Sequence, residues 1–538
     1  MVSDSTRCAQ LVVSGLLAQG VTDVVLAPGS RSAPLALILE ATARVGAVRL
    51  HVRVDERGAG FLALGLAKSS GRPVAVVTTS GTAVGNLLPA VMEAHHSAIP
   101  LLVVSADRPS WLVGFGANQT TEQTGIFTGF LSYSATVAAG APTAAQAAQV
   151  ARAVLMATGA TGGRPGPAQL NVALPEPLVD GAVQPAPTVV PVTAVALADQ
   201  PPVVLASGPR TVVVCGDADP GVGQAAVDLA TAAGLPLIAE PSSNARRGPH
   251  AMATGGLLVA GELGRRVERV VVFGRPTLSR SVNALLGSAS VEVIVVSPRP
   301  DFVDPGWRAR LIVPAVTIAP ESPEWLAAWQ QADAEQLRHI HTVTRGTAEL
   351  TGPELARLVL ASTGEGQALC LGNSNPIRDA DLVPVAAQPP VIYANRGLSG
   401  IDGTLATAIG IALGAAVPTT LLCGDLSFAH DASALAIGPG EARPELRIVV
   451  ADDDGGSIFA TLEYGRSEYA DAFERVFATP LGLDLVALSR GYGVSARRLH
   501  SAAAVDAALA EPINGLEVLV VPVDRRGRAD LSATMSLP

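Results

Sequence analysis

Charged residues, and basic ones in particular, are scarce in this chain. They make up 16% of its 538 residues, and the acidic excess gives a formal net charge of −10. This charge disfavours a general nucleic-acid-binding protein, because the phosphate backbone attracts basic surfaces. Hydrophobic residues make up 49%, which excludes a disordered chain and supplies large buried cores. At roughly 150 residues per domain, the length predicts about three domains.

Cysteine is also rare, and its spacing excludes a zinc ribbon or a disulfide framework. The four residues are Cys8, Cys215, Cys370 and Cys423. We interpret them as buried free thiols in a reducing compartment. The N-terminus carries no signal-peptide pattern, since Asp4 and Arg7 interrupt it early. A cytoplasmic protein is therefore expected.

One long segment, residues 403–424, carries no charge at all. Its length would suit a membrane span of about 20 residues. However, it contains Pro418 with several threonines and glycines, and it ends directly before Asp425. A buried helix followed by a buried strand fits this composition better, so no transmembrane segment is predicted.

Carboxylates follow two strand-like runs near the C-terminal end. Asp425 comes after the run 419–423, and Asp453 comes after the run 447–451. Open parallel sheets bind ligands beyond the carboxyl ends of their strands. The 28 residues between the two aspartates leave room for one crossover helix, so both can lie at neighbouring strand ends. Paired carboxylates beside a glycine carbonyl suit Mg²⁺, which proteins hold with a few oxygens plus substrate phosphates.

The chain carries one helix–strand unit twice, with an offset of about 345 residues. The predicted strand 74–78 and its turn at Ser80 correspond to the run 419–423 and its turn at Asp425. A repeat of this size indicates duplicated α/β domains, because solenoid repeats are only about 20–50 residues long. Apolar strands that alternate with helices imply parallel sheets covered on both faces.

A different region separates the two copies. Residues 181–210 are rich in Pro, Ala and Val and predict an extended linker. Four parallel strands are predicted next, at 211–216, 235–238, 270–274 and 291–296. We interpret the glycine-rich run 216–223 as a plain strand–helix turn, because a proline interrupts it as a dinucleotide fingerprint. The sequence thus predicts three doubly wound, parallel-sheet α/β domains, of which the first and third are similar: 1–182, 183–345 and 346–538.

Two predicted helix starts carry acids that have either a structural or a functional interpretation. Asp425 is either a helix N-cap or, with Asp453, the metal ligand of a diphosphate that binds the helix N-terminus. Glu56 is either a first-turn glutamate stabilised by the helix dipole or a buried acid of raised pKa that faces a ligand nitrogen.

With these motifs the chain resembles the thiamine-diphosphate-dependent enzymes. The family motif Gly-Asp-Gly, followed later by Asn-Asn, is matched by Gly424-Asp425-Leu426 and Asp452-Asp453-Asp454-Gly455, with Leu and Asp as departures. The resemblance implies thiamine diphosphate with Mg²⁺ or Mn²⁺, a catalytic Glu56 bound to the aminopyrimidine ring, and metal ligands at Asp425, Asp453 and the Gly455 carbonyl. The other implied cofactor contacts are Ser80, Ser399, Ile401, Leu426, Ser427 and Ile458.

Further motifs, from Ser30-Arg31 to Ile458-Phe459, resemble in order a carboligase branch of this family that acts in menaquinone biosynthesis. That resemblance implies decarboxylation of 2-oxoglutarate and transfer of its remaining four-carbon unit to isochorismate, in a homodimer or homotetramer with active sites at subunit interfaces. Arginines would bind the substrate carboxylates as two-pronged donors. The implied substrate contacts are Ser30, Arg31, Arg108, Asn118, Gln119, Arg280, Ser374, Arg378, Arg396, Ile458 and Phe459.

Two alternatives remain open. Another thiamine-diphosphate enzyme, such as a 2-oxoacid decarboxylase or one of the acetohydroxyacid-synthase type, would keep Glu56, Asp425 and Asp453 but would need no array of arginines. A non-catalytic α/β binding protein would make the pairing of these acids a coincidence.

Overall fold

The structure is a computed structural model that describes residues 3–181, 183–194, 200–297, 302–345 and 349–537. The chain divides into two compact units. The first consists of Met1–Ala198, Asp402–Ala416 and Asp431–Pro444; the second consists of Asp199–Ile401, Val417–His430 and Glu445–Pro538. The predicted domain boundaries fall on residues 182 and 346, which lie outside the described ranges, and they stay predictions.

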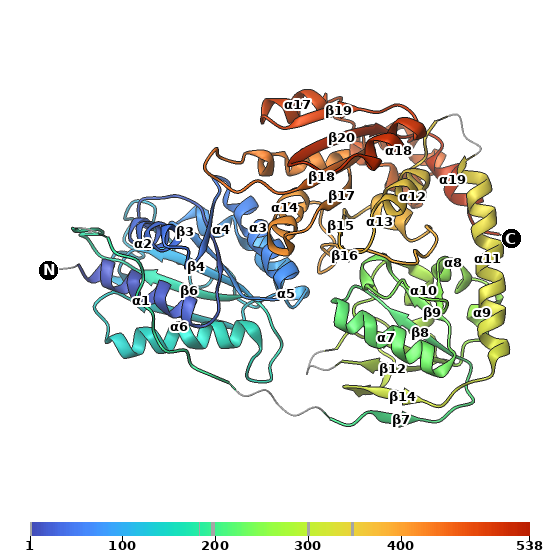
Figure 1. Cartoon of the computed structure of the whole chain (residues 1–538), viewed down its shortest axis with the longest axis horizontal. Coiled ribbons are helices and arrows are strands. Elements are labelled where there is room, and N and C mark those ends of the chain that lie inside the picture. The colour runs from blue at the N-terminus through green and yellow to red at the C-terminus, as the bar shows by residue number, and fades with distance from the viewer. Residues whose placement is uncertain (1–2, 182, 195–199, 298–301, 346–348, 538) are drawn as a thin grey trace. The chain divides into compact units, whose positions relative to one another are not determined.

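The first unit contains a six-stranded, fully parallel sheet (Figure 1). In spatial order its strands are β2 (Arg49–Val52), β1 (Asp23–Leu26), β3 (Val74–Thr78), β4 (Leu101–Asp107), β6 (Ala168–Ala173) and β5 (Tyr133–Ala138). Every residue of β1, β3, β4 and β6 is buried, as expected for a sheet that helices cover on both faces.

The second unit repeats this topology in its C-terminal part. In spatial order the parallel strands are β16 (Val391–Tyr393), β15 (Ala368–Leu371), β17 (Thr419–Gly424), β18 (Leu446–Asp452), β20 (Leu516–Pro522) and β19 (Ser495–Arg498). Numbered within each sheet, both have the strand order 2-1-3-4-6-5. This confirms the prediction that the first and third sheets are similar.

The middle sheet is also parallel but has a different order. Its strands are β10 (Ala251–Met252), β9 (Leu237–Ala239), β8 (Thr211–Cys215), β11 (Arg269–Phe273), β12 (Glu292–Val296) and β13 (Ala309–Val313), and β7 (Val203–Leu205) pairs with β14 (Val316–Ile318) beside them. This is the order of dinucleotide-binding folds. However, an ideal Cβ on Gly216 would lie 2.0 Å from the backbone of Arg275 and Pro276. The chain's own backbone occupies that position, which favours the structural interpretation of the run 216–223.

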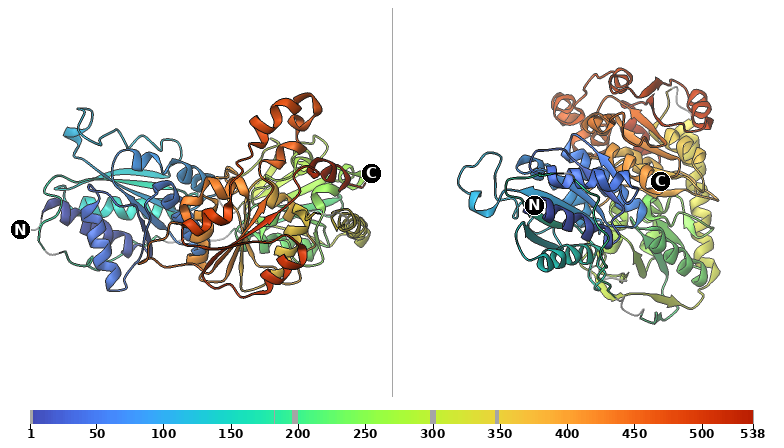
Figure 2. Two further views of the ribbon diagram at one scale, coloured as in Figure 1. Left: turned by 90° about the horizontal axis from the view of Figure 1, so that it is seen from above. Right: turned by 60° about the vertical axis from the view of Figure 1, so that its left-hand side comes forward.

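Helices cover the first sheet on both faces. They are α1 (Asp4–Ala18), α2 (Ala33–Arg44), α3 (Glu56–Ser70), α4 (Thr82–Gly85), α5 (Leu88–His96) and α6 (Thr143–Thr158), with α14 (Thr404–Ala415) from the later part of the chain. Side chains from α1, α2 and α6 form one continuous core with β1, β3, β4 and β6. Figure 1 shows α1 and α6 side by side and α3 on the opposite side of the sheet. The segment between β4 and β5 extends away from this core (Figure 2) and exposes Trp111 and Phe115.

The second unit holds the remaining principal helices. They are α7 (Pro220–Ala233), α8 (Gly255–Leu258), α9 (Glu262–Arg265), α10 (Arg280–Leu286), α11 (Pro323–Arg345), α12 (Gly352–Ser362), α13 (Asn375–Ala380), α15 (Asp425–His430), α16 (Ala470–Phe473), α17 (Leu485–Gly491), α18 (Ala502–Ala510) and α19 (Arg528–Thr534). The long α11 packs Trp325 and Trp329 into the core of the middle sheet. Further along α11, the Gln336 side chain donates to the Met535 carbonyl at 2.6 Å. One helix therefore joins the middle sheet to the C-terminal segment.

The uncharged segment 403–424 forms α14 and β17, so the prediction of a buried helix followed by a buried strand is confirmed. Within the described ranges, no helix combines the length and apolar character that a membrane crossing requires.

The buried helices α3 and α14 pack at closely matched glycines. An ideal Cβ on Gly65 would lie 2.2 Å from the Thr407 carbonyl oxygen, and one on Gly410 would lie 2.3 Å from the Leu62 carbonyl oxygen. Real Cβ atoms do not approach carbonyl oxygens so closely. The contact therefore requires glycine on both helices.

Replacing Gly65 with alanine should lower the free energy of unfolding by about 1–3 kcal/mol, because the added methyl group overpacks the α3–α14 contact. Gly85 is the matched control: it ends α4, and no atom lies within 4 Å of its ideal Cβ. Gly85→Ala should be neutral or should stabilise the protein by up to about 1 kcal/mol through helix propensity. Thermal unfolding compares the two variants, and an unchanged Tm for Gly65→Ala would contradict the packing described.

Candidate active site

A cavity of about 160 Å³ lies in the second unit, beyond the carboxyl ends of β15, β17 and β18. Nine of the predicted site residues line it: Ser374, Ile401, Asp425, Leu426, Ser427, Asp453, Gly455, Ile458 and Phe459. Adjacent parallel strands β17 and β18 pair in register up to Gly424 and Ala451. The two acidic motifs therefore leave the sheet at the same edge.

Asp425 joins the two motif loops. It is the first residue of α15 and is 8% exposed. Its Oδ1 accepts a hydrogen bond from the Leu426 amide and its Oδ2 accepts one from the Gly455 amide, both at 2.8 Å. Burial, and next the negative charge of Asp453, raise the pKa of Asp425 to about 7. The folded chain thus holds two carboxylates whose charges repel.

Asp453 offers an oxygen that the protein does not satisfy. Burial raises the pKa of Asp453 to about 6, although a hydrogen bond from Ser457 and the charges of Arg525 and Arg528 act against this rise. Its Oδ1 is buried and has no hydrogen-bond partner. An unsatisfied carboxylate oxygen beside a second carboxylate fits a divalent cation.

The remaining ligands of such a cation would not be acidic or imidazole side chains. In the part of the chain that the structure describes, no group of three or more His, Cys, Asp or Glu side chains is placed to hold a metal. Mg²⁺ commonly takes one or two carboxylates and completes its coordination with waters and phosphate oxygens. The two aspartates, with the Gly455 carbonyl nearby in sequence, match this pattern.

Gly455 must be glycine for a local reason. Its φ is +147°, and an ideal Cβ would lie 2.6 Å from the Ala478 carbonyl oxygen and 2.7 Å from Arg525 Nη1. The amide of the next residue, Gly456, also donates to the Ala478 carbonyl at 2.7 Å. The acidic loop is therefore packed tightly against the segment that ends at Ala478.

The cavity also contains residues that the sequence did not reveal. Arg528, at the start of α19, lines it and forms an ion pair with Asp379 of α13 at 2.7 Å; both side chains are buried. Asn375 lines it too, and its Nδ2 donates to Ser457 Oγ at 2.6 Å. The sequence could have indicated Arg528 through its position after the last buried strand, β20, because parallel sheets bind ligands beyond the carboxyl ends of their strands.

The three arginines predicted to bind substrate in this unit differ in environment. Arg396 is 3% exposed and donates to Asn373 Oδ1 at 2.7 Å and to Thr277 Oγ1 at 2.8 Å. Arg378 donates to the Ser374 carbonyl at 2.7 Å, and burial, then the charge of Arg396, lower its pKa. Arg280 is instead exposed on the surface, in an ion pair with Glu463 at 3.3 Å. The structure thus brings Arg378 and Arg396 together and leaves Arg280 at the surface, and none of the three lines the cavity.

Ser399, predicted as a diphosphate contact, is half-buried with a φ of +60° and is not among the cavity-lining residues. Phe459, in contrast, lines the cavity and packs against Tyr464 and Phe477. This aromatic cluster forms an apolar side of the cavity, and the implied substrate contact of Phe459 stays a prediction.

Glu56 belongs to the first unit, where it opens α3. Asp55 caps this helix by accepting from the Arg57 amide at 3.0 Å, and Asn86 Nδ2 donates to Glu56 Oε2 at 3.2 Å. The sequence left open a first-turn glutamate or a buried acid; Glu56 lies in the first turn of α3, and its side chain is half-buried. Its predicted role stays a prediction.

A second group of predicted residues meets at the carboxyl ends of β3 and β4 in the first unit. Arg108 Nη1 donates to Ser80 Oγ and, at 2.7 Å, to the Gln119 carbonyl. Arg31 donates to the Leu174 carbonyl at 2.9 Å. Burial, and next the positive charge of Arg31, lower the pKa of Arg108. Two guanidinium groups close enough to repel each other would be stabilised by a dianion between them.

Two further predicted residues of the first unit, Ser30 and Asn118, are exposed. They lie next in sequence to Arg31 and Gln119.

The chain combines parallel sheets with a carboxylate pair at one strand edge, and residues 6–126 match the family model "Thiamine pyrophosphate enzyme, N-terminal TPP binding domain". The chain is 47% identical to a 2-succinyl-5-enolpyruvyl-6-hydroxy-3-cyclohexene-1-carboxylate synthase of Kineococcus radiotolerans, an alignment that covers 97% of each protein. Synthases of the same name from Nocardioides sp. and Paenarthrobacter aurescens are each 46% identical, over 98% of this chain and 96% of theirs. The chain belongs to this family of synthases.

The two carboxylates in the cavity predict how the stability of the protein depends on pH and on bound metal. The pKa values of Asp425 and Asp453 lie above the ordinary value of 3.8, so the folded, metal-free protein binds protons more tightly than the unfolded chain. Its stability should therefore fall as the pH rises from about 4 to 7. Asp425→Asn should flatten this fall, because residue 425 then carries no charge at any pH. The variant also loses one of the two backbone hydrogen bonds, since the amide nitrogen cannot accept, so the slope of Tm with pH and not its absolute value is the readout.

Thermal unfolding in a chelator and in excess Mg²⁺, across this pH range, measures both effects. Mg²⁺ should raise the Tm of the wild type and of the control Asp471→Asn, whose side chain is exposed, but not that of Asp425→Asn. A Tm gain from Mg²⁺ in Asp425→Asn equal to that of the wild type would show that Asp425 is not a ligand.

Proposed function

We propose that this protein decarboxylates 2-oxoglutarate and joins the remaining four-carbon unit to isochorismate, giving 2-succinyl-5-enolpyruvyl-6-hydroxy-3-cyclohexene-1-carboxylate and CO₂ in menaquinone biosynthesis. One carbon–carbon bond breaks as CO₂ leaves, and one carbon–carbon bond forms to isochorismate. The observation that carries this proposal is the full-length similarity to synthases named for this product. The Asp425–Asp453 pair with its unsatisfied oxygen, in the cavity that Ile401 and Phe459 also line, supports it with a place for the metal of the cofactor.

The acidic pair would hold the metal of the cofactor. Asp425, Asp453 and the Gly455 carbonyl would bind Mg²⁺ or Mn²⁺, and the N-terminal amides of α15 near Ser427 would face the diphosphate. Bound thiamine diphosphate supplies the electron sink for decarboxylation. Ile401 would pack against the cofactor rings, while Glu56 would hold a proton at the aminopyrimidine nitrogen.

The remaining cofactor contacts are proposed on the same basis. They are Ser80, Ser399, Leu426 and Ile458.

The arginines would bind the carboxylates of the two substrates. Arginine presents a planar pair of donors that matches a carboxylate, which lysine cannot reproduce. The mutual repulsion of Arg31 and Arg108, and that of Arg378 and Arg396, supports this role because a bound carboxylate would relieve it. The polar and apolar residues that complete the proposed substrate contacts are Ser30, Asn118, Gln119, Arg280, Ser374, Ile458 and Phe459.

We further propose that the protein works in the cytoplasm as a homodimer or homotetramer with active sites at subunit interfaces. The buried state of all four cysteines is compatible with a reducing compartment. Sedimentation velocity of the purified protein measures the assembly directly.

Product analysis by mass spectrometry tests the reaction. Purified protein with thiamine diphosphate, Mg²⁺, 2-oxoglutarate and isochorismate should form an adduct heavier than isochorismate by the four-carbon unit. Pyruvate in place of 2-oxoglutarate should give no adduct. Release of CO₂ without an adduct would instead indicate a thiamine-diphosphate decarboxylase with another acceptor, and no turnover of either donor would overturn the proposal.

Glu56→Gln should reduce CO₂ release by about 10²–10⁴-fold, the usual contribution of a positioned acid or base. The amide has nearly the same shape, so the Tm should stay close to that of the wild type. Glu122→Gln, an exposed acid of the same unit, serves as the control. Near-normal turnover of Glu56→Gln would refute the assigned role.

A further inference from the structure

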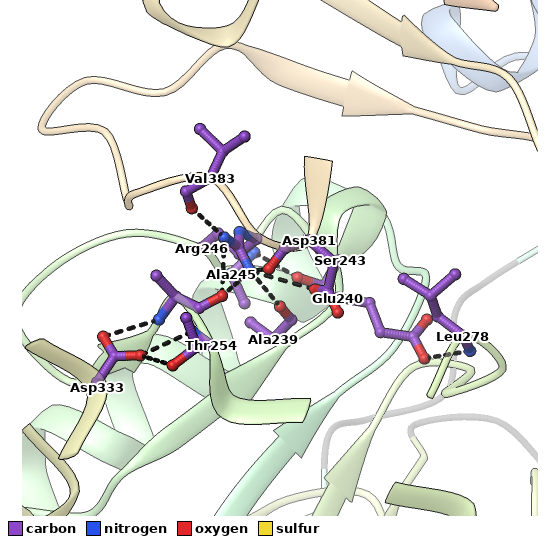
Figure 3. Close-up of polar contacts among 11 residues, drawn as sticks. Ala239, Glu240, Ser243, Ala245, Arg246, Thr254, Leu278, Asp333, Asp381 and Val383 are labelled. Carbon is purple, nitrogen blue, oxygen red and sulfur yellow. Dashed lines mark hydrogen bonds and ion pairs between the residues drawn. The ribbon is translucent and has the colours of Figure 1, made fainter. Parts of the chain in front are cut away.

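A buried carboxylate of the middle sheet holds the loop that leads to Arg280. Glu240 follows β9 and is 7% exposed. Its Oε1 accepts hydrogen bonds from the backbone amides of Thr277 and Leu278, each at 2.7 Å. Figure 3 shows Glu240 reaching the Leu278 amide. Since α10 begins two residues later at Arg280, this carboxylate fixes the approach to that arginine.

The same loop contacts a second substrate arginine. Arg396 Nη2 donates to Thr277 Oγ1 at 2.8 Å, and Arg396 Nη1 donates to Asn373 Oδ1 at 2.7 Å. Asn373 in turn donates to the Gly400 carbonyl at 2.7 Å, directly before Ile401 of the cavity. An unbroken series of contacts therefore runs from Glu240 to the edge of the cavity.

Burial determines the pKa of Glu240. Glu240 Oε2 is buried without a hydrogen-bond partner. Burial raises the pKa of Glu240 to about 8, although the two loop amides and the charge of Arg396 oppose the rise. The acceptor at Oε1 is used in either protonation state, because a neutral carboxyl also accepts through its carbonyl oxygen.

An arginine six residues further on connects the middle sheet to Arg378. Arg246 Nη2 donates to the Val383 carbonyl at 2.6 Å, and Nη1 lies 3.3 Å from Asp381 Oδ1 (Figure 3). Val383 and Asp381 follow α13, the helix that carries Arg378. The segment after β9 thus contacts the loop before Arg280, which also binds Arg396, and the residues that follow the helix of Arg378.

We propose that Glu240 is a positioning residue for substrate binding: by holding the Thr277–Leu278 loop, it sets the positions of Arg280 and Arg396. The middle sheet then contributes to recognition of the substrate carboxylates without touching the cofactor. This inference rests on the proposed function, because it assigns the two arginines to substrate.

A second buried acid provides a matched control. Asp333 of α11 accepts hydrogen bonds from the backbone amides of Ala253 at 3.1 Å and Thr254 at 2.7 Å, as Glu240 does from the amides of its own loop. Figure 3 shows Asp333 beside Thr254. Its loop carries none of the predicted substrate residues. Glu240→Ala and Asp333→Ala therefore each leave two buried amides unsatisfied. Asp333→Ala also leaves the Thr254 hydroxyl without its acceptor, so it perturbs the fold at least as much.

The experiment measures the KM of each substrate, kcat, the Kd of thiamine diphosphate with Mg²⁺, and Tm. Both alanine variants should lower Tm. Glu240→Ala should raise the KM of at least one substrate about tenfold, which is the scale of one lost hydrogen bond to a charged group. The Kd of the cofactor should stay within about twofold of the wild-type value. Asp333→Ala should leave both KM values unchanged. Glu240→Gln, which keeps the acceptor, should restore the KM to within about threefold.

Two variants of Thr277 keep the test decisive if Glu240→Ala does not fold. Thr277→Val removes the hydroxyl that binds Arg396 and should raise the KM, whereas Thr277→Ser keeps the hydroxyl and should not. Unchanged KM values in Glu240→Ala or in Thr277→Val, or equal changes in Glu240→Ala and Asp333→Ala, would overturn the inference. Absence of product from the wild type would instead overturn the proposed function.

Discussion

Two buried carboxylates of like charge, Asp425 and Asp453, impose the constraint on which the candidate site depends. Parallel pairing of β17 and β18 forces them to the same edge of one sheet. Two backbone amides satisfy Asp425, and nearby arginines only partly offset the charge of Asp453. One oxygen of Asp453 still has no partner. A bound divalent cation would offset the charge of both carboxylates, and a phosphorylated ligand would complete its coordination.

The two similar sheets carry side chains of opposite charge at equivalent strand ends. At the offset of about 345 residues, Ser80 corresponds to Asp425 and Arg108 corresponds to Asp453, and the strands that carry them have equivalent places in their sheets. In the first unit these positions form a hydrogen-bonded serine and arginine, with Arg31 close to them. In the second unit they form the acidic pair. Under the proposed function, the same strand ends would present an anion site in one sheet and a cation site in the other, because loops on a common scaffold can differ in chemistry.

Much of the fold followed from the sequence because its buried strands are uncharged and its repeat is long. Strands such as β3 and β17 were predicted correctly since every residue that faces a core must be apolar or small. The middle sheet was predicted less completely: β10 has only two residues, and β13 alternates between half-buried and exposed positions before its buried last residue, Val313. Neither pattern stands out in a single sequence.

Site residues that belong to local motifs could be predicted from the sequence, whereas contacts between distant segments could not. Asp425 and Asp453 lie at the ends of neighbouring strands, as predicted, because both follow strands whose direction the sequence indicated. Arg528 with Asp379, and Glu240 with Thr277, could not be predicted, since each pair joins segments that are distant along the chain and only the fold brings them together. The surface position of Arg280 and the half-buried Glu56 likewise depend on packing that motif matching does not describe.

The most direct test of the central claim is a calorimetric titration of the metal-free protein with thiamine diphosphate, in the presence and absence of Mg²⁺. If the acidic pair is a cation site through which the diphosphate binds, thiamine diphosphate should bind tightly with Mg²⁺ and only weakly in a chelator. Equal affinity in both conditions would contradict the account, because the cofactor would then bind without neutralising the two carboxylates.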